Sequence, residues 1–214
     1  MNKESNTYTM IYAAVTVVVV ALLLAFTSQV LRPQQERNEA IDKKRQILAS
    51  INIVADNATA EQLYKQYVVS EYLVNAQGDK VAGDAFGTEL ADELEIPLPE
   101  RKYPVFEAAI DGNKKYILSL RGAGLWGPLW GFISLNDDRN TVYGASFAHE
   151  GETPGLGAEI ERTDFGQAFI GKKFFNPEGQ FTSIAIVKAG KAAQGQDYVD
   201  GISGGTITSQ GVDA

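Results

Sequence analysis

The chain has 214 residues, no cysteine, one histidine and a formal net charge of −8, from 19 Lys and Arg against 27 Asp and Glu. Without cysteine it cannot hold an iron–sulfur cluster or a thiolate metal site, and His149 alone cannot form a histidine-rich one. The acidic balance disfavours nucleic acid as a partner, because binding a phosphate backbone needs clustered Lys and Arg. We therefore expect no metal site and no nucleic-acid function.

The first predicted element is a transmembrane helix over residues 8–27, after an N-terminal tail of residues 1–7. The run YTMIYAAVTVVVVALLLAFT contains no charge, Pro or Gly. As a helix rising about 1.5 Å per residue, it is long enough to cross roughly 30 Å of hydrocarbon. It is longer than the apolar part of a signal peptide and leads into Leu31-Arg32-Pro33, not into a small-residue cleavage site. These features favour an uncleaved anchor.

The charges that flank this span favour a topology only weakly. Lys3 precedes the span, whereas the basic residues that follow it are Arg32, Arg37, Lys43, Lys44 and Arg45. The positive-inside rule would place the following domain in the cytoplasm, but a large domain can cross a membrane regardless of flanking charge. Charge alone leaves the topology open.

The segment 28–55 is predicted to be a helical stalk or linker. After Pro33, apolar residues recur at helical spacing among charged ones, at Ile41, Ile47, Leu48 and Ile51. Farther on, Thr59 and Gln62 have the spacing of a capping box. We therefore predict a second helix from this box to about Val68.

A soluble α+β domain with an antiparallel β-sheet flanked by helices is predicted over residues 56–214. From Lys102 onward, strand-like runs alternate with turn residues, at 105–110, 115–120, 129–135, 141–147 and 181–188. Asp111-Gly112-Asn113 and Asn136-Asp137-Asp138 have the composition of hairpin turns. Helices followed by a meander of strands are typical of this fold class.

A glycine-rich segment at residues 122–127 satisfies the pattern G-x-G-x-x-G. A dinucleotide-binding fold requires a helix after this pattern, but Pro128–Leu135 has the composition of a strand. We therefore do not expect a Rossmann fold. Trp126 and Trp130 could present flat apolar faces to a ligand, although local sequence favours ordinary core packing.

Two further loops could bind a ligand. In the segment 149–157, Pro154 and Gly155 fit a type II turn, whose backbone groups could contact the edge of a planar heterocycle, although a plain surface turn is also common. His149 is expected to be structural, since no nucleophile–His–acid arrangement surrounds it. The segment 200–209 combines glycines with hydroxyls, which is compatible with either a phosphate-binding loop or a simple Gly/Ser loop. Thr208 or Ser209 is the expected N-cap of a following helix.

Three segments in this order carry a family resemblance: GLWGPLWGF at 124–132, HEGETPGLGAEI at 149–160 and DGISGGTITSQGV at 200–212. With the single span before them, they resemble the flavin-bearing C subunit of the bacterial sodium-translocating NADH:quinone reductase. The resemblance implies an FMN joined through its phosphate to the threonine that closes a D-G-x-S/T-G-A-T motif. That motif falls on Asp200, Gly201, Ser203 and Gly204, with Thr206 as the acceptor.

The resemblance also implies the other contacts of the cofactor. It implies that Gly204 and Gly205 leave room for the phosphoribityl chain and that Ser203 and Thr208 also bind the cofactor. It places the isoalloxazine ring near Trp126 and against the T-P-G-L-G loop, at Thr153, Gly155, Leu156 and Gly157. The implied partners are the other subunits of a membrane reductase complex and a flavin transferase. The implied location is the bacterial inner membrane, with the domain on the periplasmic side.

The chain departs from the family pattern in two places, and two other assignments stay open. Gly205 stands where the motif usually has Ala, and residues 210–214 are barely one helical turn, where family members continue into a helix. The G subunit of the ion-translocating ferredoxin:NAD oxidoreductase shares T-P-G-L-G and the flavinylation motif, although the G-L-W…W-G-F stretch favours the sodium pump. A membrane-anchored ligand-binding domain without redox activity is the alternative from another class.

Overall fold

The computed structural model describes residues 6–213, and it begins with one long helix, α1 (Asn6–Ser50, 45 residues). The chain divides into two compact units, one up to Asp42 and one from Lys43 onward. The first unit contains the apolar run, with a mean hydropathy of 2.6 over its most apolar window, and none of that window is buried. By length and composition, this helix can cross a membrane.

Helix α1 is continuous through Pro33, whereas the sequence predicted a separate helical pattern that begins after this proline. The helix ends at Ser50 for a local reason. Asn52 adopts a φ of 61°, and the N–H groups of Asn52 and Ile53 donate to the carbonyls of Ala49 and Leu48. This pair of hydrogen bonds is a Schellman motif, which satisfies the last carbonyls of a helix and turns the chain away from its axis.

The second helix, α2 (Ala60–Tyr67), begins with a different cap from the one predicted. Thr59 makes no side-chain cap at the helix start. The Asp56 carboxylate instead accepts hydrogen bonds from the N–H groups of Ala58 and Thr59, while the Thr59 hydroxyl accepts from the Asp56 N–H at 3.2 Å. The predicted capping box of Thr59 and Gln62 is therefore wrong, and Asp56 and Thr59 instead exchange hydrogen bonds in the turn that leads into the helix.

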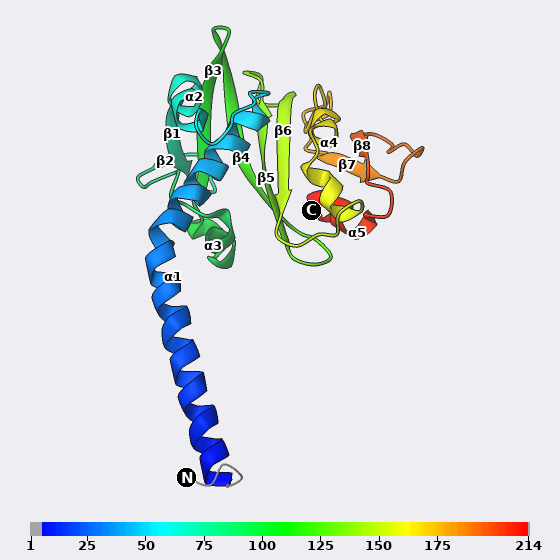
Figure 1. Ribbon diagram of the computed structural model, residues 1–214. Helices are drawn as coiled ribbons and strands as arrows, with labels where there is room; N and C mark the ends of the chain where they lie inside the picture. Colours follow the sequence, from blue (N-terminus) through cyan, green and yellow to red (C-terminus); the bar gives the residue numbers. More distant parts are fainter. Residues whose placement is uncertain (1–5, 214) are drawn as a thin grey trace. The chain divides into compact units, whose positions relative to one another are not determined.

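A six-stranded sheet forms the centre of the domain, in the order β2-β1-β3-β4-β5-β6, with every neighbouring pair antiparallel (Figure 1). Its strands are β1 (Val68–Val74), β2 (Lys80–Val81), β3 (Tyr103–Ile110), β4 (Asn113–Ala123), β5 (Pro128–Leu135) and β6 (Val142–His149). The two-residue loop of Asp111 and Gly112, with φ of 49° and 76°, confirms the predicted hairpin. The α+β fold and its antiparallel sheet are likewise confirmed.

The remaining elements are short. Helix α3 (Leu90–Glu95) and a 3₁₀ turn, η1 (Leu98–Glu100), precede β3. After β6 come η2 (Gly157–Glu161), α4 (Thr163–Gln167), β7 (Ile184–Val187), β8 (Asp197–Asp200) and α5 (Thr206–Asp213). The predicted strand at 181–188 is shorter than expected, and it pairs with β8 in a separate parallel sheet of two strands.

The two faces of the large sheet are covered by different elements. On one face, Phe106, Ile117 and Phe132 pack against Ile47 and Leu48 of the last turns of α1. The other face packs against η2, α4, β7 and β8 through a second cluster of buried residues: Leu129, Ile133, Phe147, Ile160, Phe165, Phe169, Ile184 and Val199. The sheet is thus the middle layer of the domain.

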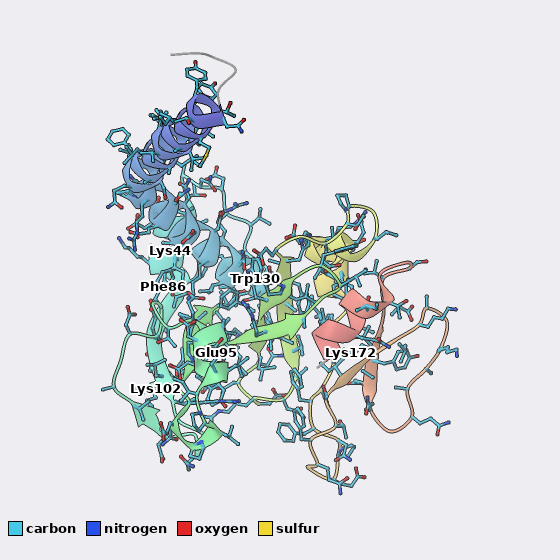
Figure 2. The ribbon with its side chains drawn as sticks, turned by 90° about the horizontal axis from the view of Figure 1, so that it is seen from below. Lys44, Phe86, Glu95, Lys102, Trp130 and Lys172 are labelled. Atoms are coloured by element: carbon cyan, nitrogen blue, oxygen red, sulfur yellow. The ribbon has the colours of Figure 1, made fainter. Side chains whose placement is uncertain are left out.

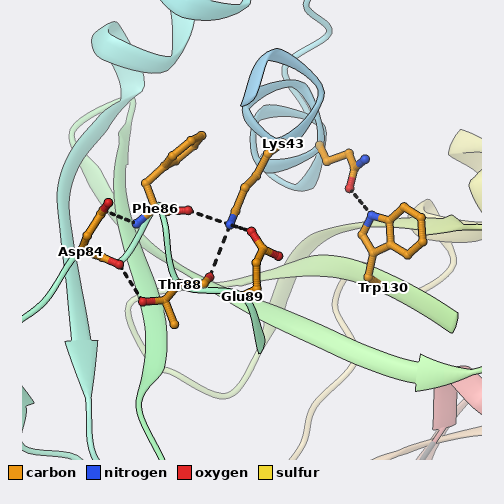
Figure 3. Close-up of polar contacts among 7 residues, drawn as sticks. Lys43, Asp84, Phe86, Thr88, Glu89 and Trp130 are labelled. Atoms are coloured by element: carbon orange, nitrogen blue, oxygen red, sulfur yellow. Dashed lines mark hydrogen bonds and ion pairs between the residues drawn. The ribbon is translucent and has the colours of Figure 1, made fainter. Parts of the chain in front are cut away.

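Polar contacts also attach the end of α1 to the sheet layer (Figures 2 and 3). The Lys43 ammonium donates to the Phe86 carbonyl at 2.7 Å and forms an ion pair with Glu89 at 2.7 Å. The Trp130 indole N–H donates to the Gln46 side chain at 3.0 Å. In Figure 2, Lys44 lies beside Phe86, with its ammonium 5.6 Å from the ring centroid. Trp130 is therefore structural, as local sequence favoured.

Candidate functional site

The three segments singled out in the sequence meet at one end of the sheet. They are the β4–β5 loop (residues 124–127), the loop after β6 (150–156) and the segment formed by loop 201–205 and helix α5. The carboxylate of Glu152 joins all three. One oxygen accepts the backbone N–H of Trp126 at 2.8 Å, and the other accepts the Thr208 hydroxyl at 2.5 Å. We refer to this arrangement of Glu152, Trp126 and Thr208 as the carboxylate junction.

Glu152 is ionised at neutral pH although only 5% of its surface is exposed. Burial raises its pKa, but hydrogen bonds from Thr208 and from the backbone N–H groups of Trp126 and Leu125 lower the pKa by more. Its own N–H donates to Nδ1 of His149 at 3.1 Å. His149 is thus hydrogen-bonded within the loop, in line with the predicted structural role.

Glycines make the carboxylate junction possible because they leave room for its atoms. A Cβ on Gly124 would overlap one Glu152 oxygen, and a Cβ on Gly157 would overlap the other and come within 2.5 Å of the Thr208 hydroxyl. Gly157 was predicted from the sequence, but Glu152 was not. A single carboxylate in an E-T-P-G-L-G stretch carries no signal of burial, because its partners come from two distant segments.

Helix α5 differs from the prediction in where it begins. It starts at Thr206, so the prediction that Thr208 or Ser209 is its N-cap is wrong. With eight residues, the helix is also longer than the single turn expected at 210–214. Only 2% of the surface of Thr208 and of Ser209 is exposed. The Ser209 hydroxyl accepts a hydrogen bond from the Ile202 N–H at 2.9 Å. This hydrogen bond connects loop 201–205 to helix α5, which follows it.

Thr206 is the exposed hydroxyl of α5, and Ser203 and Gly204 beside it are also exposed. Gly204 has a φ of +78°, and a Cβ there would come within 2.6 Å of the Leu156 side chain. Gly205 is buried, and a Cβ there would lie 3.2 Å from the Gly157 backbone. Glycine at position 205, where the family motif has alanine, therefore avoids a close contact between loop 201–205 and the backbone of Gly157.

The T-P-G-L-G loop and Trp126 lie at the surface of the same region. Gly155 has a φ of 77°, and the Leu156 N–H donates to the Thr153 carbonyl at 3.1 Å, which confirms the predicted turn. Leu156 is 43% exposed and Trp126 67% exposed, so the core interpretation is wrong for Trp126. Because β5 follows residues 122–127 directly, the rejection of a Rossmann fold is confirmed.

Two clefts adjoin loop 201–205. The first, of about 380 Å³, lies between the end of β7, the loop and α5, and Thr206 lines it. The second, of about 560 Å³, is shallower and is lined by residues that include Gly155, Arg162, Asp200 and Ser203. Asp200 and Ser203 are exposed, whereas Gly201 is half-buried against Ser209. Every residue predicted for the flavin motif therefore lies within or beside these clefts.

Comparisons with known proteins identify the class of this site. A family model described as an FMN-binding domain matches residues 124–214. The C subunit of the Na⁺-translocating NADH-quinone reductase of Pseudomonas aeruginosa is 30% identical, over 99% of this chain and 90% of the relative. Its counterpart from Haemophilus ducreyi is 29% identical, over 99% and 88%. The solved structure of the C subunit from Parabacteroides distasonis is 55% identical with a TM-score of 0.81, covering 86% of this chain and 89% of that one.

Proposed function

The chain belongs to the family of the C subunits of the Na⁺-translocating NADH-quinone reductase, and on this basis we propose that it carries FMN joined by a phosphoester to Thr206. It is a subunit of a multi-subunit membrane reductase and contains an FMN-binding domain. This assignment favours the sodium pump over the ferredoxin-linked relative that the motifs left open. The geometry of the hydroxyls in α5 supports the attachment to Thr206.

The observation that carries this proposal is the different exposure of the hydroxyls in α5. Thr208 donates to Glu152 and Ser209 accepts from Ile202, and both are almost fully buried. Thr206, at the first position of the helix, is exposed and lines a cleft. An enzyme that modifies α5 from solvent can therefore reach the hydroxyl of Thr206 without unfolding the helix.

The surrounding residues fit a flavin nucleotide. The side chains of Trp126, Leu156 and Ile207 are exposed apolar groups on the three segments that meet at Glu152, and such groups can cover a planar ring. Gly204 leaves the backbone open beside Thr206, where a larger residue would collide with Leu156. FMN supplies the electron-transfer chemistry when bound, and the protein holds and orients it. No side chain is required as an acid or base.

Attachment needs a donor in which the phosphate of FMN is activated as an anhydride. A bond forms between the Thr206 oxygen and the FMN phosphorus, the anhydride P–O bond breaks so that the other half of the anhydride leaves as a phosphate, and the hydroxyl proton is released. We propose that a separate flavin transferase catalyses this step and recognises the segment from Asp200 to Thr206. The exposure of Asp200 and Ser203 is compatible with recognition from solvent.

We also propose that α1 is a single membrane span and that the FMN-binding domain lies on the periplasmic side. The apolar part of the helix is long enough to span a bilayer. The flanking charges argue weakly for the opposite orientation, but such charges are a poor guide for a large domain after one span. A reporter fused after Ala214 that is active only in the cytoplasm would refute the periplasmic placement.

Intact-protein mass spectrometry tests the attachment. Wild-type chain coexpressed with a flavin transferase should gain the mass of FMN less one water, and Thr206→Ala should gain nothing. Thr163→Ala is the matched control, because Thr163 is likewise an exposed first residue of a short helix. An unmodified wild type, or a fully modified Thr206→Ala, would refute the proposal and would favour a ligand-binding domain without a covalent flavin.

A further inference from the structure

The two clefts beside loop 201–205 differ in charge. They share the lining residues Ile202 and Ser203. Among the described residues that line the first cleft, Lys188 alone carries a charge. The second cleft is lined by the acidic side chains Glu159, Asp164 and Asp200 and by Arg162. Arg162 is already paired, to Glu159 at 3.2 Å and to Asp164 at 3.1 Å.

A phosphodiester is therefore favoured in the first cleft and opposed in the second. It carries one negative charge, and the whole chain already has a net charge of −8. In the second cleft, it would face an excess of carboxylates, whereas in the first it would face a lysine. Thr206, the proposed acceptor, lines the first cleft and not the second.

The backbone around Lys188 fixes its place relative to the flavin motif. In the parallel pair β7–β8, Val187 lies opposite Asp200, and the Gly201 N–H donates to the Val187 carbonyl at 2.7 Å. Lys188 is the next residue along the chain and begins a turn closed by the Lys191 N–H, which donates to its carbonyl at 2.9 Å. The lysine is thus held beside the start of the motif by main-chain hydrogen bonds.

The other lining residues suit a polar chain that ends in a phosphate. Gln210 lies one helical turn after Thr206, so both side chains lie on the same side of α5. Ser203 adds an exposed hydroxyl, and Ile186 and Ile202 provide apolar surface for the carbon atoms of a ribityl chain.

We propose that this cleft binds the phosphate and ribityl chain of the flavin, and that Lys188 is the cation paired with the phosphodiester on Thr206. The inference rests on the proposed attachment and adds a residue that is outside all three sequence motifs. A lysine that is paired in this way stabilises the phosphate both while the bond forms and in the finished product.

The experiment compares Lys188→Gln, Lys188→Arg and the control Lys191→Gln in the full chain. Lys191 belongs to the same turn and is exposed, but it does not line the cleft. We expect flavin transfer to Lys188→Gln to be about two- to fivefold slower at low salt, the effect of losing one exposed charge pair. Lys188→Arg and Lys191→Gln should stay near the wild-type rate, and high salt should reduce the difference.

A second measurement separates phosphate binding from contact with the transferase. The ³¹P resonance of the attached phosphodiester should shift in Lys188→Gln holoprotein but not in Lys191→Gln. Slower transfer with an unchanged resonance would assign Lys188 to the docking of the transferase and would overturn the inference. Wild-type rate and resonance in Lys188→Gln would also overturn it, while the attachment to Thr206 would stand. A wild type without flavin would refute the attachment itself.

Discussion

Under the last turns of α1, the sheet is held by apolar side chains, with Phe106, Ile117 and Phe132 packed against Ile47 and Leu48. At the proposed flavin site, three segments of the chain are joined by one buried carboxylate, with glycines packed around it. The stability of the first region depends on how well apolar side chains fill the space between α1 and the sheet. The stability of the second depends on the charge of Glu152 and on glycines that leave room for its oxygens. The two regions should therefore respond differently to mutation and to pH.

The largest loss of stability is expected from the apolar region. Phe106 is fully buried, so Phe106→Ala should lower the free energy of unfolding by about 3–5 kcal/mol, from lost burial and the cavity that remains. Urea unfolding measures this change. The folded fraction should still accept flavin on Thr206, because the substitution leaves the carboxylate junction intact. A loss below about 1 kcal/mol would show that this core can collapse around the cavity.

The carboxylate junction should be almost as sensitive. Glu152→Ala leaves the part-buried Trp126 N–H and the buried Thr208 hydroxyl without their acceptor, which should cost about 2–4 kcal/mol. Glu152→Gln retains one acceptor oxygen and should cost less. Flavin transfer should slow in both, because the position of α5 depends on Thr208. The control Glu150→Gln changes an exposed neighbouring carboxylate, and an equal loss there would refute the special role of Glu152.

Acid should weaken the carboxylate junction and spare the apolar region. The pKa of Glu152 in the folded protein is below its ordinary value of 4.5, because hydrogen bonds outweigh burial. Its contribution is therefore fully present above the unfolded pKa and is lost as pH falls through the folded pKa. Between pH 6 and pH 3, wild type should lose more stability than Glu152→Gln. Parallel pH profiles for the two proteins would contradict this expectation.

The smallest expected changes in the free energy of unfolding come from substituting the two tryptophans. Trp130→Phe removes the indole hydrogen bond to Gln46 and should cost about 1 kcal/mol. Trp126 is 67% exposed, so Trp126→Phe should change stability by no more than about 0.5 kcal/mol. Guanidinium unfolding of the apoproteins compares the pair. A larger cost at Trp126 would mean that its ring, and not only its backbone N–H, stabilises the site.

The apolar region was largely predictable from sequence, because strand-like runs of residues between clear turn residues identify strands such as β3 and β5. Strand β1 was not predicted, since it follows α2 with no Gly or Pro between them to end the helical pattern. The parallel pairing of β7 with β8 was missed as well, because a four-residue strand near the C-terminus does not indicate its partner.

The proposed flavin site was predictable in its motifs but not in its internal contacts. Thr206, Gly155 and Leu156 were identified by resemblance, and the structure brings their segments together. Glu152 and Lys188 were not identified. The first acts through contacts with residues 26 and 56 positions away, and the second lies outside every motif. The contacts of Glu152 and the proposed role of Lys188 follow from the tertiary arrangement, which local patterns do not encode.

The central claim concerns one hydroxyl, and fragment-ion mass spectrometry of a single peptide tests it most directly. Trypsin cleaves after Lys191, so the peptide 192–214 contains Ser203, Thr206, Thr208 and Ser209 together. From protein matured with a flavin transferase, the mass of FMN less one water should map to Thr206 alone. An unmodified peptide, or a flavin on another of these hydroxyls, would contradict the account.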